Sequence, residues 1–214
     1  MSENCQHLHR LFNSLPRQSF PFDGEAIPDN GIYILFENGE VAHGADRIVR
    51  VGTHRGVNQL HPRLREHFVK ENKDRSIFRK NIGRAILQKT NDRFLKQWNW
   101  DLTSREARDK YLPLLDKDKQ RSVEQAVSEY IQGNLSFVVF SVDSKEERLE
   151  WEQKIISTVS WCTECRPSHN WLGKHSPKQK IREGGLWLEK GLYKKALSKE
   201  ELKIMEGKLT QAQN

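Results

Sequence analysis

The sequence has 214 residues, which suits one elaborated domain or at most two small ones. Charged residues make up 30% of it and its longest apolar runs are too short to cross a bilayer, so we expect a soluble protein rather than an integral membrane protein. The first residues lack the apolar core of a secretory signal, and three cysteines, an odd number, argue against a disulfide framework. Both features predict a cytoplasmic location. The formal net charge of +7 favours a polyanionic partner.

Residues 1–26 are expected to form an N-terminal extension without catalytic chemistry. The sequence predicts a short helix around residues 7–14, ended by Pro16, and an extended piece at the Phe-Pro-Phe of residues 20–22. We expect the extension to pack on the edge of the domain that follows.

Two strands joined by a turn come next. Residues 31–37 and 47–53 are short and rich in Ile and Val, a composition typical of strands. Asn38-Gly39 is the strongest turn signal in the chain and predicts a hairpin.

The helix that follows the hairpin carries two charged candidates. Pro62 suits its first turn. At 100° per residue, Arg63 and His67 lie side by side on the flank of its apolar face, one turn apart. The charged loop after it, residues 70–75, is either solvated surface or a phosphate contact through Lys73.

The middle of the chain predicts an insertion followed by further regular elements. Residues 92–121 are polar and irregular, and the alternation around Trp98 and Trp100 suggests a short strand. A helix at about residues 122–132 leads to a third apolar strand at 135–142.

The next helix, which begins near Ser144, has a carboxylate in the middle of its apolar face. Glu152 lies at the centre of this face, which is formed by Leu149, Trp151, Ile155, Ile156 and Val159. A carboxylate there is unfavourable unless something compensates its charge. Either Glu152 reaches an edge or pairs with an arginine of the core, or it binds a divalent cation.

Residues 173–214 are expected to form a C-terminal elaboration. They hold a basic run at 174–182 and end in an amphipathic helix at 199–209. The basic run either meets nucleic-acid phosphates or is a solvated loop. Trp171 and Trp187 are candidates for stacking on unpaired bases, with core packing as the default interpretation.

Three short motifs between residues 31 and 67 appear in a fixed order: Gly31-Ile32-Tyr33, then Arg50-Val51-Gly52, then Arg63 with His67 four positions later. This order resembles that of the GIY-YIG nucleases, with arginine in place of the tyrosine of the second motif. The resemblance covers residues 27–172. It implies an α+β fold in which helices flank a three-stranded antiparallel sheet.

The resemblance also implies metal-dependent hydrolysis of DNA phosphodiester bonds. Glu152 would hold Mg²⁺ or Mn²⁺, and Arg63 would stabilise the charge that builds at the phosphate. Tyr33 would orient or deprotonate the attacking water, and a base role needs neighbouring cations to stabilise its phenolate. His67 would hydrogen-bond to Tyr33, to water or to the phosphate. Asn170, which follows a proline, would help to orient the substrate.

Two residues leave alternatives open. Arg50 either leaves Tyr33 as the sole base and adds a phosphate contact, or marks a site that has lost activity. His54, just after the second strand, either lies near a substrate phosphate or is structural. A non-catalytic nucleic-acid-binding module on the same fold is therefore the alternative function. Restriction and phage defence are settings compatible with DNA cleavage, and a homodimer would ease cutting of both strands.

The cysteines allow a separate hypothesis. Cys162 and Cys165, with His169 and His175 close behind, offer the ligand types of a zinc site. The loop between the two pairs is very short for four ligands to converge. Buried free thiols are the favoured interpretation, and no context supports a cysteine nucleophile.

Overall fold

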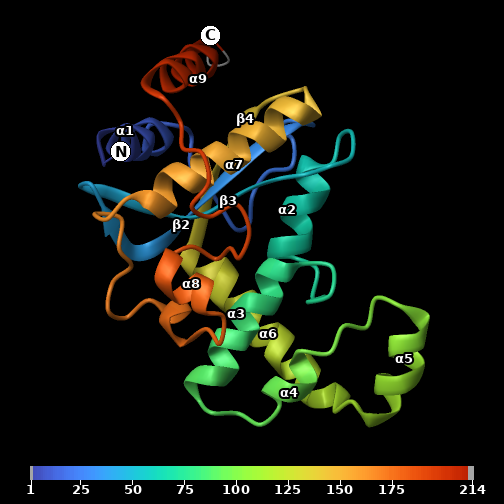
Figure 1. Cartoon of the computed structure of the whole chain (residues 1–214). Coiled ribbons are helices and arrows are strands. Elements are labelled where there is room, and N and C mark those ends of the chain that lie inside the picture. The colour runs from blue at the N-terminus through green and yellow to red at the C-terminus, as the bar shows by residue number, and fades with distance from the viewer. Residues whose placement is uncertain (1, 212–214) are drawn as a thin grey trace.

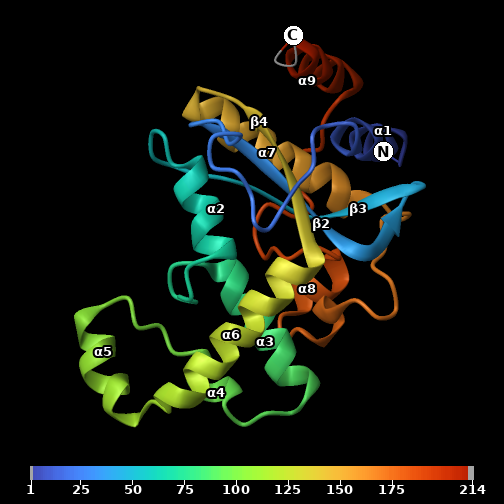
Figure 2. The same cartoon turned by 180° about the vertical axis from the view of Figure 1, so that it is seen from behind.

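The structure is a computed structural model that describes residues 2–211 (Figures 1 and 2). Its elements, in chain order, are α1 (Ser2–Asn13), β1 (Gln18–Ser19), β2 (Gly31–Ala42), β3 (Ala45–Thr53), α2 (Leu60–Phe68), α3 (Ile77–Lys89), α4 (Leu95–Trp98), α5 (Arg105–Tyr111), the 3₁₀ turn η1 (Leu112–Leu114), α6 (Lys117–Asn134), β4 (Leu135–Ser141), α7 (Lys145–Trp161), the 3₁₀ turn η2 (Leu172–His175), α8 (Gln179–Gly184) and α9 (Lys199–Gln211).

The strands form one antiparallel sheet in the order β1-β4-β2-β3. β2, β3 and β4 are the three predicted strands, so the predicted α+β class and antiparallel sheet are confirmed. The two-residue β1, which adds to the outer edge of β4, was not predicted. β2 pairs with strands on both of its sides, which fixes the direction of every side chain along it.

The hairpin turn lies at His43-Gly44, so the predicted turn at Asn38-Gly39 is wrong. His43 and Gly44 have φ of 55° and 74°, and positive φ at both central positions is the requirement of a type I′ two-residue hairpin turn. Gly39, with φ of 80°, lies inside β2, in the stretch where the register between β2 and β3 shifts. Its positive φ therefore forms an irregularity of the strand rather than the turn.

Helices cover both faces of the sheet (Figure 1). Ile32, Ile34 and Phe36 of β2 belong to a core shared with α1, α7 and α9, whereas Tyr33 and Leu35 belong to a core shared with α2, α3 and α6. This alternation follows from the two-residue period of a strand. Within residues 2–211 no helix is long and apolar enough to span a bilayer.

Serine side chains cap the starts of several helices. The hydroxyl oxygens of Ser76, Ser144 and Ser198 accept hydrogen bonds from backbone N–H groups three residues later, at 3.2, 3.3 and 3.1 Å. The caps of α7 and α9 confirm the predicted starts of those helices.

The predicted strand around Trp98 is wrong, because α4 ends at that residue. The Trp98 indole donates a hydrogen bond to the Lys80 carbonyl at 2.9 Å and lies over Gly83, where a Cβ would be 2.3 Å from the ring. In Figure 1, α4 and α5 lie at the far end of α3 and α6 from α9.

Trp171 and Trp187 are core residues, and each donates an indole hydrogen bond to Oε2 of Glu37, at 2.9 and 2.8 Å. The Trp187 N–H also donates to the Val49 carbonyl at 2.8 Å, so the C-terminal segment runs along the open edge of β3. The hypothesis that these tryptophans stack on bases is therefore wrong, because packing already occupies their rings.

Candidate active site

Both strand motifs need glycine, because neighbouring atoms occupy the place that a Cβ would take. A Cβ on Gly31 would lie 2.2 Å from the Phe140 carbonyl oxygen of β4. A Cβ on Gly52 would lie 2.2 Å from the hydroxyl oxygen of Tyr33, which is its partner across the β2–β3 ladder. Gly52 therefore provides the space in which the Tyr33 ring crosses β3.

Tyr33 is the first member of a chain of hydrogen bonds. Its hydroxyl lies 2.8 Å from Nε2 of His67, and Nδ1 of His67 lies 2.7 Å from Oγ of Ser76. The same Oγ caps α3 by accepting the Arg79 N–H. The start of α3 thus sets the orientation of the imidazole, and the imidazole sets that of the phenol.

His67 is fully buried and its pKa lies well below the ordinary value of 6.5. Burial is the main cause, and the nearby positive charges of Arg63, Arg50 and Arg79 add to it. His67 is therefore neutral at pH 7, with one ring nitrogen able to accept a proton.

Arg50 stands beside Tyr33 on the same face of the sheet. Its Nε donates to the Tyr33 hydroxyl at 3.3 Å, and one terminal nitrogen donates to the Trp187 carbonyl at 2.6 Å. Its guanidinium also lies 4.8 Å from the centre of the Phe78 ring. These contacts hold Arg50 against the phenol.

Glu152 projects from α7 to the end of β3. Its Oε1 accepts the Thr53 N–H at 3.1 Å, and the side chain makes no direct ion pair with any residue that the structure describes. Burial raises the pKa of this carboxyl, although the positive charge of Arg50 and the Thr53 N–H oppose the shift. The expected pairing with a core arginine is therefore a longer-range attraction rather than a contact.

A cavity of about 370 Å³ opens between the end of β3 and α2. Arg63 lines it, and one of its terminal nitrogens donates to Oε2 of Glu66 at 2.8 Å and to the Arg75 carbonyl at 3.1 Å. Thr53 lines the same cavity and holds Glu152. Glu152 itself is not among the lining residues, but the charge of Arg63 opposes the rise in the pKa of its carboxyl, so the two side chains lie near each other at the end of β3.

His54 also lines the cavity, but both of its ring nitrogens are used by the backbone. Nε2 accepts the Gly31 N–H at 3.2 Å and Nδ1 donates to the Gly56 carbonyl at 2.8 Å. Burial lowers the pKa of His54. The structural interpretation of His54 fits this geometry, since the ring joins the start of β2 to the loop after β3.

Two predicted substrate contacts are not brought to the cavity. The Lys73 side chain is buried, with Nζ 2.9 Å from the Asp74 carboxylate and 2.7 Å from the Trp100 carbonyl. Asn170 is exposed, in a loop that Ser168 ties to Glu40 near the other end of β2. Neither residue can reach a phosphate bound beside Arg63 in this structure.

One lining residue, Arg55, was missed by the sequence analysis. It is exposed and lines the cavity together with Arg63. Its position two residues after the end of β3, next to His54, could have identified it as a candidate phosphate contact.

The family of the chain is shown by comparison with known families. A family model described as a GIY-YIG domain matches residues 10–214. The chain therefore belongs to the GIY-YIG family, whose members are typically endonucleases and generally use divalent metals. No curated protein and no solved structure matches the chain.

Proposed function

We propose that this protein is a divalent-metal-dependent endonuclease that hydrolyses DNA phosphodiester bonds. The observation that carries the proposal is that Arg63 and Thr53 line one cavity, while the Thr53 N–H binds the Glu152 carboxylate and the charge of Arg63 acts on it. Beside them, Tyr33 is hydrogen-bonded to a neutral imidazole and to a guanidinium. Together these groups meet the needs of phosphodiester hydrolysis, which are charge neutralisation, proton removal from water and stabilisation of the leaving oxygen.

Arg63 and Arg55 bind the phosphate in this proposal. Arg63 has donors beyond its contact with Glu66, and its planar fork suits the oxygens of a phosphodiester. Arg55 is exposed at the mouth of the same cavity and attracts the approaching backbone of DNA.

Glu152 is the residue that would hold Mg²⁺ or Mn²⁺. One carboxylate suits Mg²⁺, which keeps several waters and takes its remaining ligands from substrate phosphates. Two observations support the binding of a cation by Glu152. Burial disfavours the ionised form of this carboxylate, and no cationic side chain among the described residues contacts it directly. When bound, the ion supplies Lewis acidity at the phosphate and at the leaving oxygen.

Tyr33, supported by His67, removes the proton of the attacking water in this proposal. With Nδ1–H donating to Ser76, Nε2 of neutral His67 accepts a hydrogen bond from the Tyr33 hydroxyl and orients it, and Arg50 stabilises the phenolate that forms when this hydroxyl loses its proton to solvent. The phenolate then takes a proton from the attacking water. Tyr33 is only 1% exposed, so water reaches its oxygen after movement of the surrounding side chains.

A plasmid-nicking assay with Mg²⁺ or Mn²⁺ tests the proposal. We expect nicking by the wild type, and at least about a 100-fold loss in Glu152→Ala, Arg63→Ala and Tyr33→Phe. Glu150→Gln is the matched control, since Glu150 lies on the same helix, is exposed and pairs with Lys154. Equal nicking by wild type and all three site variants would show that another site, or a contaminant, cleaves the DNA.

The alternative is a non-catalytic DNA-binding module on the same fold. The buried hydroxyl of Tyr33 and the arginine at position 50 favour it. Under this alternative the wild type binds DNA but does not cleave linear, supercoiled, branched or single-stranded forms with either metal.

If cleavage occurs, a comparison of modified and unmodified phage DNA as substrates tests a role in restriction or phage defence. Sedimentation with and without DNA tests the homodimer.

A further inference from the structure

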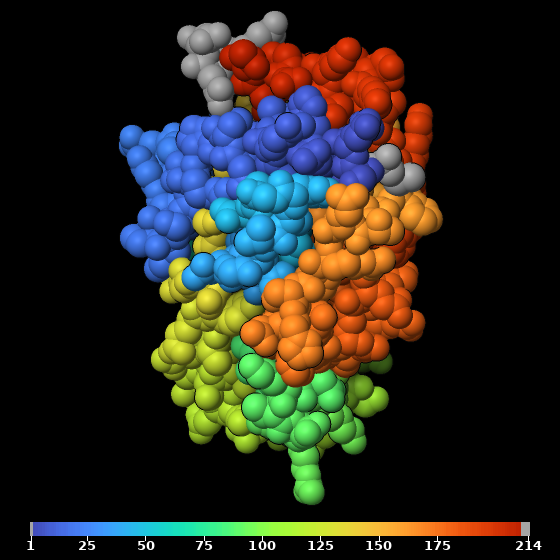
Figure 3. Space-filling model, turned by 90° about the vertical axis from the view of Figure 1, so that its left-hand side faces the viewer, coloured from blue at the N-terminus to red at the C-terminus, as the bar shows by residue number. Residues whose placement is uncertain are grey.

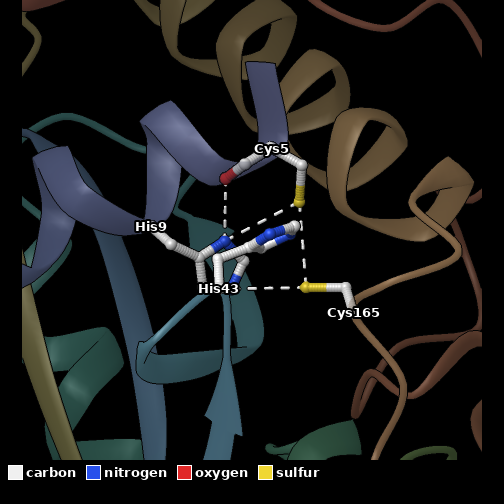
Figure 4. A group of neighbouring side chains, drawn as sticks. All are labelled: Cys5, His9, His43 and Cys165. Carbon is white, nitrogen blue, oxygen red and sulfur yellow. Dashed lines mark hydrogen bonds between the residues drawn. The ribbon is translucent and has the colours of Figure 1, made fainter. Parts of the chain in front are cut away.

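A second group of metal-ligand side chains lies outside the cavity, on the opposite face of the sheet from Tyr33. It consists of Cys5 and His9 of α1, His43 at the hairpin turn, and Cys165 in the loop after α7 (Figure 4). One ligand atom from each lies within 4.8 Å of the others. The four side chains are almost completely buried.

We propose that Cys5, His9, His43 and Cys165 form a structural zinc site. The ligand set, two thiolates and two imidazoles, is the type that selects tetrahedral Zn²⁺. The site goes beyond the proposed nuclease function, because none of its residues lines the cavity beside Arg63.

The spacing of the ligand atoms fits one tetrahedral ion. Bond lengths of about 2.3 Å to sulfur and about 2.05 Å to nitrogen place two sulfurs about 3.8 Å apart, and a sulfur and a nitrogen about 3.6 Å apart. In the structure, Sγ of Cys5 and Sγ of Cys165 are 3.7 Å apart. Sγ of Cys165 and Nε2 of His9 are 3.4 Å apart.

The orientation of His9 suits metal ligation through Nε2. Its Nδ1 donates to the Cys5 carbonyl at 2.9 Å, which fixes the tautomer and leaves the lone pair of Nε2 directed towards Cys165. A backbone carbonyl on the second ring nitrogen is the usual support for a metal-bound histidine. The Ile48 N–H, 3.2 Å from Nε2, now uses that lone pair, so zinc binding exchanges this hydrogen bond for a coordinate bond.

The charge of the group also fits. Two thiolates neutralise one Zn²⁺, and a neutral complex is the form that a buried site tolerates.

Zinc at this place would tie together three segments that are distant in the sequence. In Figure 3, α1 (dark blue), the hairpin (light blue) and the chain after α7 (orange) adjoin on one face of the molecule. The sequence hypothesis of Cys162, Cys165, His169 and His175 shares only Cys165 with this set. His169 and His175 are exposed, and Cys162 lies 3.4 Å from Nε2 of His43 but outside the four-residue group.

Metal analysis tests the proposal. The protein is purified without added metal and without a metal-affinity column. We expect one zinc per chain in the wild type and in Glu152→Ala, and its loss in Cys5→Ser and Cys165→Ser. Cys162→Ser is the matched control and is expected to keep the zinc. Because the Cys5 variant could fail to fold, the wild type is also loaded with Co²⁺, where strong visible absorption of tetrahedral thiolate-bound cobalt is expected.

Chelation provides the stability readout. Removal of zinc from the wild type should lower Tm by about 10 °C, and Zn²⁺ but not Mg²⁺ should restore it. The proposal is overturned if the purified protein contains no metal, its three thiols are all reactive towards a thiol reagent, and its Tm does not change when chelator is added. A Cys5–Cys165 disulfide in the purified protein would overturn it too, as would zinc that only the Cys162→Ser change removes. Failure of nicking leaves all of these results unaffected, so the two proposals are tested separately.

Discussion

At the scale of single residues, Glu152, the proposed metal ligand, destabilises the fold when it is ionised. Its carboxylate sits on the apolar face of α7, and burial raises its pKa above the ordinary 4.5. Between pH 4.5 and the raised value, the folded chain keeps a proton that the unfolded chain has released. Stability present at low pH is therefore lost as the pH rises through this window, and ionised Glu152 destabilises the fold at neutral pH.

The change Glu152→Gln should accordingly raise Tm by a few degrees at pH 7. Glutamine keeps an oxygen for the Thr53 N–H and carries no charge to bury. The difference should vanish below about pH 4, where wild-type Glu152 is protonated in both states. Thermal unfolding across the pH range measures this, with Glu150→Gln expected to show no such gain. A Tm for Glu152→Gln at or below that of the wild type at pH 7 would contradict the explanation.

At the scale of elements, the site depends on the closeness of β2 and β3 at one point. Gly52 leaves space for the Tyr33 hydroxyl, and α2 supplies His67 to meet it. α3 then fixes the imidazole through its capping residue Ser76. The same elements carry a buried ion pair, in which Arg79 of α3 and Glu124 of α6 bond at 2.8 Å. The side chains that we propose to be catalytic are thus held by packed elements rather than by loops.

The change Gly52→Ala should displace the Tyr33 hydroxyl from His67. We expect the free energy of unfolding to fall by about 1–3 kcal/mol, because overpacking forces side-chain and backbone shifts. Nicking should fall as far as in Tyr33→Phe. Gly133→Ala is the matched control: no atom lies within 4 Å of its added Cβ in α6, so it should gain about 0.5–1 kcal/mol. Urea unfolding measures both, and wild-type stability and nicking in Gly52→Ala would refute the steric account.

At the scale of the whole molecule, the segments before and after the predicted nuclease region pack with it. α1 and α9 share a core with β2, and Trp171 and Trp187 meet at the carboxylate of Glu37. Tyr130 also donates to Glu37, so one buried carboxylate links α6, the sheet and the C-terminal segment. The family match over residues 10–214 agrees with this shared packing.

The net charge of +7 gives a prediction for the whole surface. DNA affinity should fall linearly on a plot of log K against log salt concentration, because binding releases counterions. Glu152→Ala should keep the slope of the wild type. Arg63→Ala should reduce it by about one unit if this side chain contacts a phosphate. Fluorescence anisotropy with labelled duplex measures the slopes, and an unchanged slope in Arg63→Ala would remove that residue from the phosphate site.

Much of the fold could be predicted because its signals are local. Short apolar runs rich in β-branched residues marked β2, β3 and β4, the predicted start near Ser144 marked α7, and the amphipathic pattern at 199–209 marked α9. Glu152 was found because a carboxylate on an apolar helical face is unusual on physical grounds. The hairpin turn was misplaced because Asn38-Gly39 has the composition of a turn, whereas the pairing of β2 with β3 resumes at Val41 and continues the strand beyond it.

Other features could not be predicted, since they depend on residues that meet only in the folded chain. The direction of Lys73 is set by Asp74 and the Trp100 carbonyl, and the burial of Trp187 is set by Glu37. Cys5 and Cys165 are separated by 160 positions and meet because α1 packs beside α7.

The sequence alone therefore determined the strands, the principal helices and the family motifs, because each is encoded in a short window by period, capping and steric need. Only the tertiary structure decided which distant side chains share a site. It brought Glu152 to the N–H of Thr53, a residue that lines the cavity of Arg63, and it gathered two cysteines and two histidines on the face of the sheet opposite Tyr33. The physical reason is that these meetings follow from packing against both faces of one sheet, which no local pattern specifies.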